Sequence, residues 1–164
     1  MRYLIDGYNL LHATGHLAGK VGPHGLERAR QALLDRLAVF PGADAGGVTV
    51  VFDARRAPAS VESEQVYQGV QIRYALDREA DDLIEELIRQ DATPRSLTVV
   101  SDDRRLKEAA RRRQCPMQSC LDFYDAAAAA PRPPLATEAA ERAGTLSDQE
   151  VQAWMEAFGS DMDD

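Results

Sequence analysis

Short apolar runs alternate with segments of helical spacing along the first 130 residues, and this alternation restricts the folds open to the chain. The apolar runs cover residues 3–5, 46–53, 69–75 and 96–101, with a short fifth run at 116–119. Helical spacing of apolar residues marks 26–40, 78–90, 103–113 and 120–130. Strands that alternate with helices are typical of βαβ units. The sequence therefore predicts an α/β fold with a central, mainly parallel sheet and helices on both faces.

Aspartates stand where most of these predicted strands end. Asp6 follows the first strand, Asp53 ends the second, and Asp102 and Asp103 follow the fourth. Asp81 lies in the first turns of the helix after the third strand, about 90° from the centre of its apolar face, so it can lean toward the sheet. Because open parallel sheets bind ligands at the carboxyl ends of their strands, these carboxylates are expected to gather at one edge.

A cluster of carboxylates at one sheet edge would repel strongly unless a cation neutralised it or some groups took up protons. Oxygen-rich clusters suit the hard ions Mg²⁺ and Mn²⁺. Asn9, one turn beyond Asp6, and Ser101 are placed to support such a site. Each aspartate also has an ordinary explanation, because aspartate caps helices and forms turns. The residues alone leave a site and ordinary turn chemistry about equally favoured.

Four motifs in this order resemble those of the YacP-like NYN-domain proteins, a branch of the PIN-like nuclease superfamily. They read YLIDGYNLLH, VTVVFDARR, READDLIEELI and LTVVSDDRRL, within residues 1–130. The resemblance implies a PIN-like α/β/α sandwich and a metal-dependent ribonuclease that leaves a 5′-phosphate and a 3′-hydroxyl. One characterised relative is linked to mRNA cleavage at the ribosome.

The family's site residues carry over onto matching positions of this chain. The resemblance implies that Mg²⁺ or Mn²⁺ is held by four catalytic aspartates, Asp6, Asp53, Asp81 and Asp103. Around them it places Asn9, Ser101 and Asp102 as supporting residues. In the last motif the family reads serine, a small polar residue, aspartate and arginine, so Asp103 matches the acid. The doubled aspartate leaves open whether Asp102 or Asp103 faces the metal.

Basic residues close to these motifs are candidates for contact with RNA phosphates. Arg55 and Arg56 directly follow Asp53, and Arg104 follows Asp103. Arginine forms bidentate contacts with phosphate, although a solvated surface charge explains each position nearly as well. The formal net charge is −8, of which residues 131–164 carry 2 − 8 = −6, so the first 130 residues are close to neutral.

The C-terminal part of the sequence differs in composition from the first 130 residues, which are expected to form the NYN, PIN-like nuclease domain. Residues 131–146 are rich in proline and alanine and read as a linker. Residues 147–164 are expected to form an acidic helix and tail. The apolar face of that helix, which contains Trp154, favours docking within the chain over binding a partner protein. No signal peptide or membrane span is visible, so the expected location is the cytoplasm.

These observations favour a cytoplasmic endoribonuclease that acts on mRNA or other RNA, with the ribosome as one way of presenting it. A receiver domain would need a pair of acids after the first strand, but Gly7 follows Asp6. A haloacid-dehalogenase phosphatase would need an aspartate where Tyr8 stands. The main alternative is a non-catalytic RNA- or ribosome-binding module on the same fold.

Overall fold

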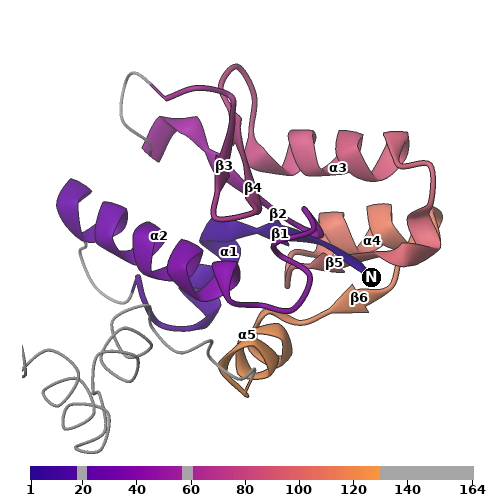
Figure 1. Ribbon diagram of the computed structural model, residues 1–164. Coiled ribbons are helices and arrows are strands. Elements are labelled where there is room, and N and C mark those ends of the chain that lie inside the picture. Colours follow the sequence, from indigo (N-terminus) through magenta and orange to yellow (C-terminus); the bar gives the residue numbers. More distant parts are fainter. Residues whose placement is uncertain (18–21, 57–60, 130–164) are drawn as a thin grey trace, which may run out of the picture. The chain divides into compact units, whose positions relative to one another are not determined.

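Six strands form one sheet in the order β3-β4-β2-β1-β5-β6 in the computed structural model (Figure 1). The structure describes residues 1–17, 22–56 and 61–129. The predicted linker 131–146 and acidic helix 147–164 lie outside these ranges. The strands are β1 (Arg2–Asp6), β2 (Val48–Asp53), β3 (Glu64–Tyr67), β4 (Val70–Ala75), β5 (Leu97–Val100) and β6 (Met117–Gln118).

Parallel pairing runs through the sheet from β4 to β6, and only β3 is antiparallel to its neighbour. β1 lies in the middle, with β2 on one side and β5 on the other. The chain passes from β1 to β2 and later returns to the opposite side of β1 as β5. That reversal is a topological switch point, where open α/β sheets form their ligand crevice.

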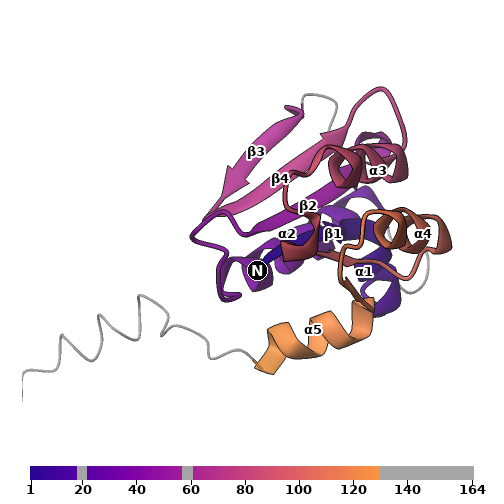
Figure 2. The ribbon, with the colours of Figure 1, turned by 90° about the vertical axis from the view of Figure 1, so that its right-hand side faces the viewer.

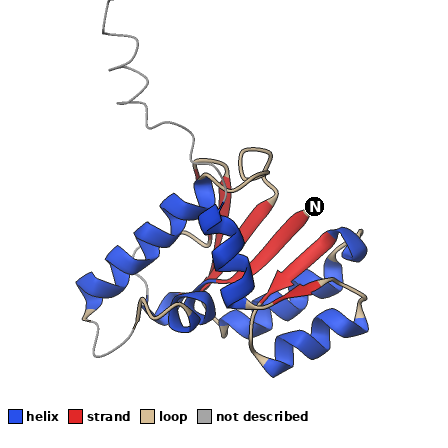
Figure 3. Cartoon of the chain, turned by 90° about the horizontal axis from the view of Figure 1, so that it is seen from below, coloured by secondary structure: helices blue, strands red, loops and turns tan. Residues whose placement is uncertain are grey.

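Helices cover both faces of the sheet, as Figures 1 and 2 show. They are α1 (Gly7–Ala13), α2 (Pro23–Ala38), α3 (Ala80–Gln90), α4 (Arg104–Arg112) and α5 (Cys120–Ala129), with single 3-10 turns η1 (Ala54–Arg56) and η2 (Pro94–Ser96). α1, α2 and α5 pack together, and α3 packs on α4. The view along the sheet in Figure 3 shows the strands between these helices. The predicted α/β/α sandwich is confirmed.

Two apolar cores lie on opposite faces of the sheet. One core joins Ile5, Val50 and Phe52 to buried residues of α1, α2 and α5. The other joins Leu4, Val51 and residues of α3 and α4. The central strands are therefore buried on both faces, which explains their continuous apolar sequence. No helix in the described part of the chain is long and apolar enough to cross a membrane.

Two elements were not expected from the sequence. α1 has only seven residues, and it is held by the Asp6 cap and by Leu10 and Leu11, which are buried. β3 pairs only at one edge of the sheet, and its burial alternates between exposed and half-buried residues. Short elements like these give weak periodic signals, because tertiary packing supplies much of their stability.

Gly7 begins α1 because no side chain fits there. A Cβ atom at this position would lie 2.3 Å from Cε1 of Phe52, a ring that is fully buried in the core. The backbone of Gly7 has no left-handed conformation that would otherwise require glycine. The Asp6-Gly7 pair is therefore not a tight turn. It is the point where a strand runs straight into a helix that packs closely on β2.

We expect Gly7→Ala to lower the free energy of unfolding by about 1 to 3 kcal/mol, because the new methyl group overpacks the core against Phe52. Urea denaturation measures this loss. Gly22→Ala is the control, since Gly22 has open space around it and should lose less than about 1 kcal/mol. Equal losses of stability in both variants would show that the contact with Phe52 is not the reason that position 7 requires glycine.

Candidate active site

A pocket of about 270 Å³ opens at the carboxyl ends of the central strands. All four aspartates predicted as metal ligands line it. The residues around the pocket are Asp6, Tyr8, Asn9, His12, Asp53, Glu79, Ala80, Asp81 and Asp103. The structure thus brings together side chains from β1, α1, β2, α3 and the β5–α4 loop, as the switch point predicts.

Asp6 is the most buried of these acids, with 7% of its surface exposed. It caps α1, because its Oδ1 accepts a hydrogen bond from the backbone N–H of Asn9 at 3.3 Å. Burial raises the pKa of Asp6 to about 7, and the nearby charges of Asp81 and Asp103 add to the rise. One oxygen of Asp6 therefore caps the helix while the residue also lines the pocket.

Asp81 is half-buried in the first turn of α3 and faces the same pocket. Burial raises its pKa, and the charge of Asp103 raises it further. Asp82, its neighbour, instead forms an ion pair with Arg105 of α4, with 2.5 Å between Oδ1 and Nη2. The rotation of 100° per residue separates the two adjacent acids, so one reaches the site and the other does not.

Asp103, not Asp102, faces the pocket. The Oδ1 atom of Asp103 accepts hydrogen bonds from the backbone N–H groups of Arg105 and Leu106 and so caps α4. Asp102 is exposed and turns toward α5, where its Oδ1 accepts from the backbone N–H of Cys120 at 3.3 Å. The two members of the doubled aspartate therefore serve different helices, and only one of them belongs to the carboxylate cluster.

Asp53 ends β2 with 24% of its side chain exposed. Its Oδ1 accepts from the backbone N–H of Arg55 at 2.9 Å, and the guanidinium Nε of Arg55 lies 3.7 Å from the same oxygen. Arg55 also reaches Glu79 at 3.4 Å, so it stands beside the pocket while keeping 65% of its side chain exposed. A cation in that position is available to an anionic ligand at the pocket rim.

Asn9 and Ser101 accept hydrogen bonds from the backbone of the β5–α4 loop, which carries Asp103. Oδ1 of Asn9 accepts from the backbone N–H of Asp102 at 3.0 Å, which ties α1 to the β5–α4 loop. Ser101 is fully buried, and its Oγ accepts from the backbone N–H of Asp103 at 3.1 Å. Both residues thus hold the loop that carries Asp103.

Arg104 does not line the pocket. Arg104 is 93% exposed on α4 and pairs with Glu108, with 3.6 Å between Nε and Oε1. The side chain of Arg56 lies outside what the structure describes. Contact of Arg55, Arg56 and Arg104 with RNA stays a prediction.

Four further residues line the pocket that sequence reasoning did not select, namely Tyr8, His12, Glu79 and Ala80. Tyr8 is buried beside Phe52, with ring centroids 5.1 Å apart. Glu79 occupies the N-cap position of α3, where its backbone carbonyl, not its side chain, accepts hydrogen bonds from the helix. His12 is exposed and follows Asn9 by three residues, which places both on one face of a helix. Had α1 been recognised as a helix that begins at Gly7, the spacing of three residues between Asn9 and His12 would have predicted that His12 also faces the pocket.

The chemistry of the pocket fits a divalent cation. In Asp6, Asp53 and Asp103 the Oδ2 atom makes no hydrogen bond within the described part of the chain, so a hard oxygen donor is available on each. Burial is the main cause of the raised pKa values of Asp6 and Asp81, and the charge of Asp103 adds to the rise in both. Among the described residues, however, no three His, Cys, Asp or Glu side chains already form a compact metal-binding group. Binding a metal would have to draw the carboxylates together.

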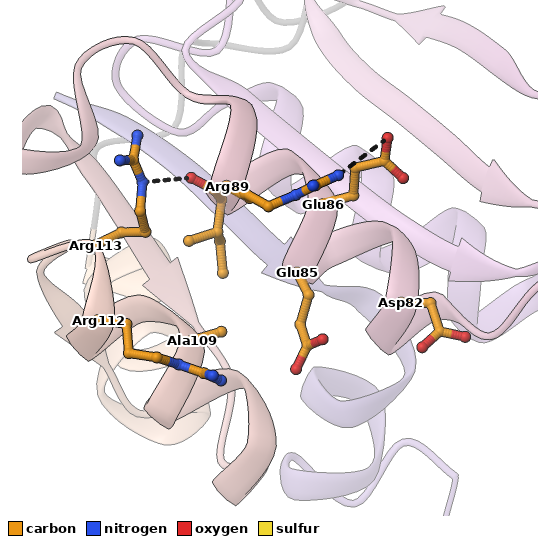
Figure 4. A pocket seen from close by; sticks show the side chains of 8 residues that line it. Asp82, Glu85, Glu86, Arg89, Ala109, Arg112 and Arg113 are labelled. Atoms are coloured by element: carbon orange, nitrogen blue, oxygen red, sulfur yellow. Dashed lines mark hydrogen bonds and ion pairs between the residues drawn. The ribbon is translucent and has the colours of Figure 1, made fainter.

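A larger cavity of about 440 Å³ lies between α3 and α4, away from the strand ends. Figure 4 shows that its lining consists of side chains on the facing surfaces of the two helices, among them Glu85, Arg112 and Arg113. Arg113 is committed to α3, since its Nε donates to the carbonyl of Ile88 at 3.4 Å. This cavity is a groove between two packed helices, and its three acids, Asp82, Glu85 and Glu86, share it with three arginines, Arg89, Arg112 and Arg113.

The sequence matches the family described as YacP-like NYN domain over residues 3–158. The chain belongs to this family. The match extends beyond the four motifs, since it includes most of the segment after residue 130. NYN domains are part of the PIN-like superfamily, so the chain has a PIN-like nuclease fold.

Solved structures of Rae1 (YacP) from Bacillus subtilis share this fold. One is 22% identical to this YacP-like chain, with a TM-score of 0.60, and the comparison covers 97% of this chain and 88% of that one. A single-residue variant of the same protein is 23% identical, with a TM-score of 0.56 and coverage of 78% and 76%. Among curated protein sequences, none matches this chain.

We expect Asp6→Asn to stabilise the metal-free protein at pH 8. The folded-state pKa of Asp6 is about 7, above its ordinary value of 3.8, so the folded state holds the proton more tightly than the unfolded state. Stability should therefore fall as pH rises from about 4 to about 7, by on the order of 2 to 4 kcal/mol. Asparagine keeps the helix cap and removes this slope.

Urea denaturation of both proteins in EDTA, at pH 4 and pH 8, measures the effect. The two proteins should be nearly equal at pH 4 and differ at pH 8, where the variant is more stable. A variant less stable than wild type at pH 8 would contradict the assignment of a raised pKa to Asp6.

Proposed function

We propose that this protein is a metal-dependent endoribonuclease that hydrolyses phosphodiester bonds of RNA. One observation carries the proposal: Asp6, Asp53, Asp81 and Asp103 converge on a single pocket at the switch point of a PIN-like sheet. Burying mutually repelling carboxylates reduces stability. Four carboxylates kept in one pocket despite this cost indicate that their negative charge serves a function.

The four aspartates would hold Mg²⁺ or Mn²⁺ through their oxygen atoms. Bound there, the metal would supply the positive charge that makes a water nucleophilic and stabilises the negative charge of the phosphate. The chain's own part is to keep the carboxylates in place: backbone N–H groups fix one oxygen of Asp6, Asp53 and Asp103. Because the pKa of Asp6 is about 7, this carboxyl group is mostly protonated below that pH. Metal binding to Asp6 should therefore release a proton below about pH 7.

The surroundings of the pocket suit a phosphodiester. Arg55 lies at the rim with a largely exposed guanidinium, available for a flanking phosphate. Asn9 lines the pocket and carries an amide group, which donates to phosphate oxygens without adding charge. The pocket is open and mostly polar, as a site that receives a charged phosphodiester would be.

Messenger RNA presented by the ribosome is the substrate that the family resemblance favours, with the cytoplasm as the place of action. Arg56, Arg104 and the predicted helix containing Trp154 belong to this proposal as contacts to RNA or to partners. Weak cleavage of free RNA would agree with it, because a ribosome could supply the orientation that a short free RNA lacks.

A non-catalytic RNA-binding module on the same fold is the second candidate. The pocket argues against it, because a protein that only binds phosphate gains nothing from four carboxylates that face its ligand. The two functions differ in their need for metal. A binding module should hold RNA equally well in EDTA, whereas the nuclease requires a divalent ion for cleavage.

We expect Asp53→Asn to weaken Mn²⁺ binding by about 10- to 100-fold and to abolish cleavage of a labelled RNA oligonucleotide, since it removes one anionic ligand. Titration calorimetry measures binding, and gel analysis in Mn²⁺ or EDTA measures cleavage. Asp125→Asn, an exposed acid on α5, is the control and should change neither. If the wild type binds no Mn²⁺ even with RNA present, the metal-dependent mechanism is wrong.

Asp103→Asn and Asp102→Asn form a matched pair that tests which acid of the doublet serves the site. Asparagine caps helices as well as aspartate does, so both variants should fold. We expect Asp103→Asn to lower RNA cleavage at least 100-fold. Asp102→Asn should lose only a few-fold, because its amide oxygen can still accept from Cys120. The opposite order, measured with the same oligonucleotide, would exchange the two roles.

A further inference from the structure

A closed set of three hydrogen bonds lies beside the pocket and joins segments far apart in the sequence. Asn9 Oδ1 accepts from the backbone N–H of Asp102 at 3.0 Å and from Sγ of Cys120 at 3.1 Å. Asp102 Oδ1 accepts from the backbone N–H of Cys120 at 3.3 Å. The triangle ties α1, the β5–α4 loop and the first residue of α5 to one another.

The triangle fixes which way the Asn9 amide points. A backbone N–H can only donate, so the atom that faces Asp102 must be the amide oxygen, not the nitrogen. The Cys120 thiol occupies the second acceptor position of that oxygen. The amide nitrogen is then turned away from both partners, and Nδ2 makes no hydrogen bond to the residues that the structure describes. Because Asn9 lines the carboxylate pocket, its two N–H donors are available there.

Cys120 is suited to act as the donor in this contact. It is fully buried at the start of α5, and burial raises the pKa of its thiol to about 12, so the group keeps its proton at neutral pH. A thiolate would repel the Asn9 oxygen and could not make the bond. The sulfur is also inaccessible to solvent, which makes chemical reactivity a poor explanation for a cysteine at this place.

We propose that Cys120 is a positioning residue of the nuclease site, holding the Asn9 amide so that its nitrogen donates to a phosphate oxygen of RNA in the pocket. The inference rests on the proposed function and adds a residue that touches neither the substrate nor any of the four carboxylates. The bond from Asp102 alone leaves one acceptor position of the amide oxygen free. The thiol supplies the second constraint, and the nitrogen then stays directed into the pocket before the substrate arrives.

The experiment compares Cys120→Ala with Cys115→Ala on a labelled RNA oligonucleotide in Mn²⁺. Cys115 is the other buried cysteine, and it packs in the opposite core against α3 and α4. Both variants lose one buried thiol, so their stability losses should be similar. We expect kcat to fall about tenfold in Cys120→Ala and less than twofold in Cys115→Ala. Mn²⁺ affinity should stay within about twofold of wild type in both.

Two further variants test whether Cys120 acts through Asn9. Cys120→Ser keeps a donor and should recover most of kcat. In an Asn9→Ala background, adding Cys120→Ala should change kcat by less than twofold, because the amide that Cys120 positions is already gone. Such non-additivity is not expected of a residue that only contributes to folding.

Three outcomes would overturn the inference. An unchanged kcat in Cys120→Ala would show that the thiol does not position the amide. A tenfold loss of kcat that persists in the Asn9→Ala background would show that Cys120 does not act through Asn9. Absence of metal-dependent cleavage by the wild type would overturn the proposed function itself, and the inference with it. The first two outcomes leave the nuclease assignment intact, so the two failures can be told apart.

Discussion

Parallel pairing of β1 with β2 on one side and with β5 on the other is the constraint on which the rest of this structure depends. It directs the ends of all three strands to one edge, and it makes the chain reverse its direction of travel across the sheet at that point. The connections that leave the strands must then separate to opposite faces. The crevice between them is formed by backbone topology. Asp6 and Asp53 reach it because they end their strands, and Asp103 reaches it from the loop three residues after the end of β5.

The acids in this crevice combine two tasks that are usually considered alternatives. Asp6 and Asp103 each cap a helix with one oxygen, which stabilises the element that begins there, and each also presents charge to the pocket. Helix capping orients the carboxylates without any additional residue. The unfavourable part of the arrangement falls mainly on Asp6, because it is the most buried of them and burial raises its pKa to about 7.

The sequence predicted the long elements and the carboxylate cluster well, since strand ends and helical phase are local properties. The helical phase of α3 predicted that Asp81 leans toward the sheet, and Asp81 lines the pocket. The sequence could not separate Asp102 from Asp103, because that choice depends on where α5 begins, and Cys120 is distant in the chain. His12 was missed for a related reason: α1 is stabilised by its buried leucines and its cap, and seven residues show little periodicity of their own.

The contact between Gly7 and Phe52 links the core to the distance between two acids. Gly7 is bonded to Asp6, and Phe52 is bonded to Asp53, so their close contact lies directly beside the two strand-end acids that line the pocket. Divalent ions differ in the oxygen distances that they accept. In the proposed metal site, a smaller ring at position 52 or a methyl group at position 7 is therefore expected to shift Asp6 and Asp53 relative to each other and so to change which ion binds, while every proposed ligand stays the same.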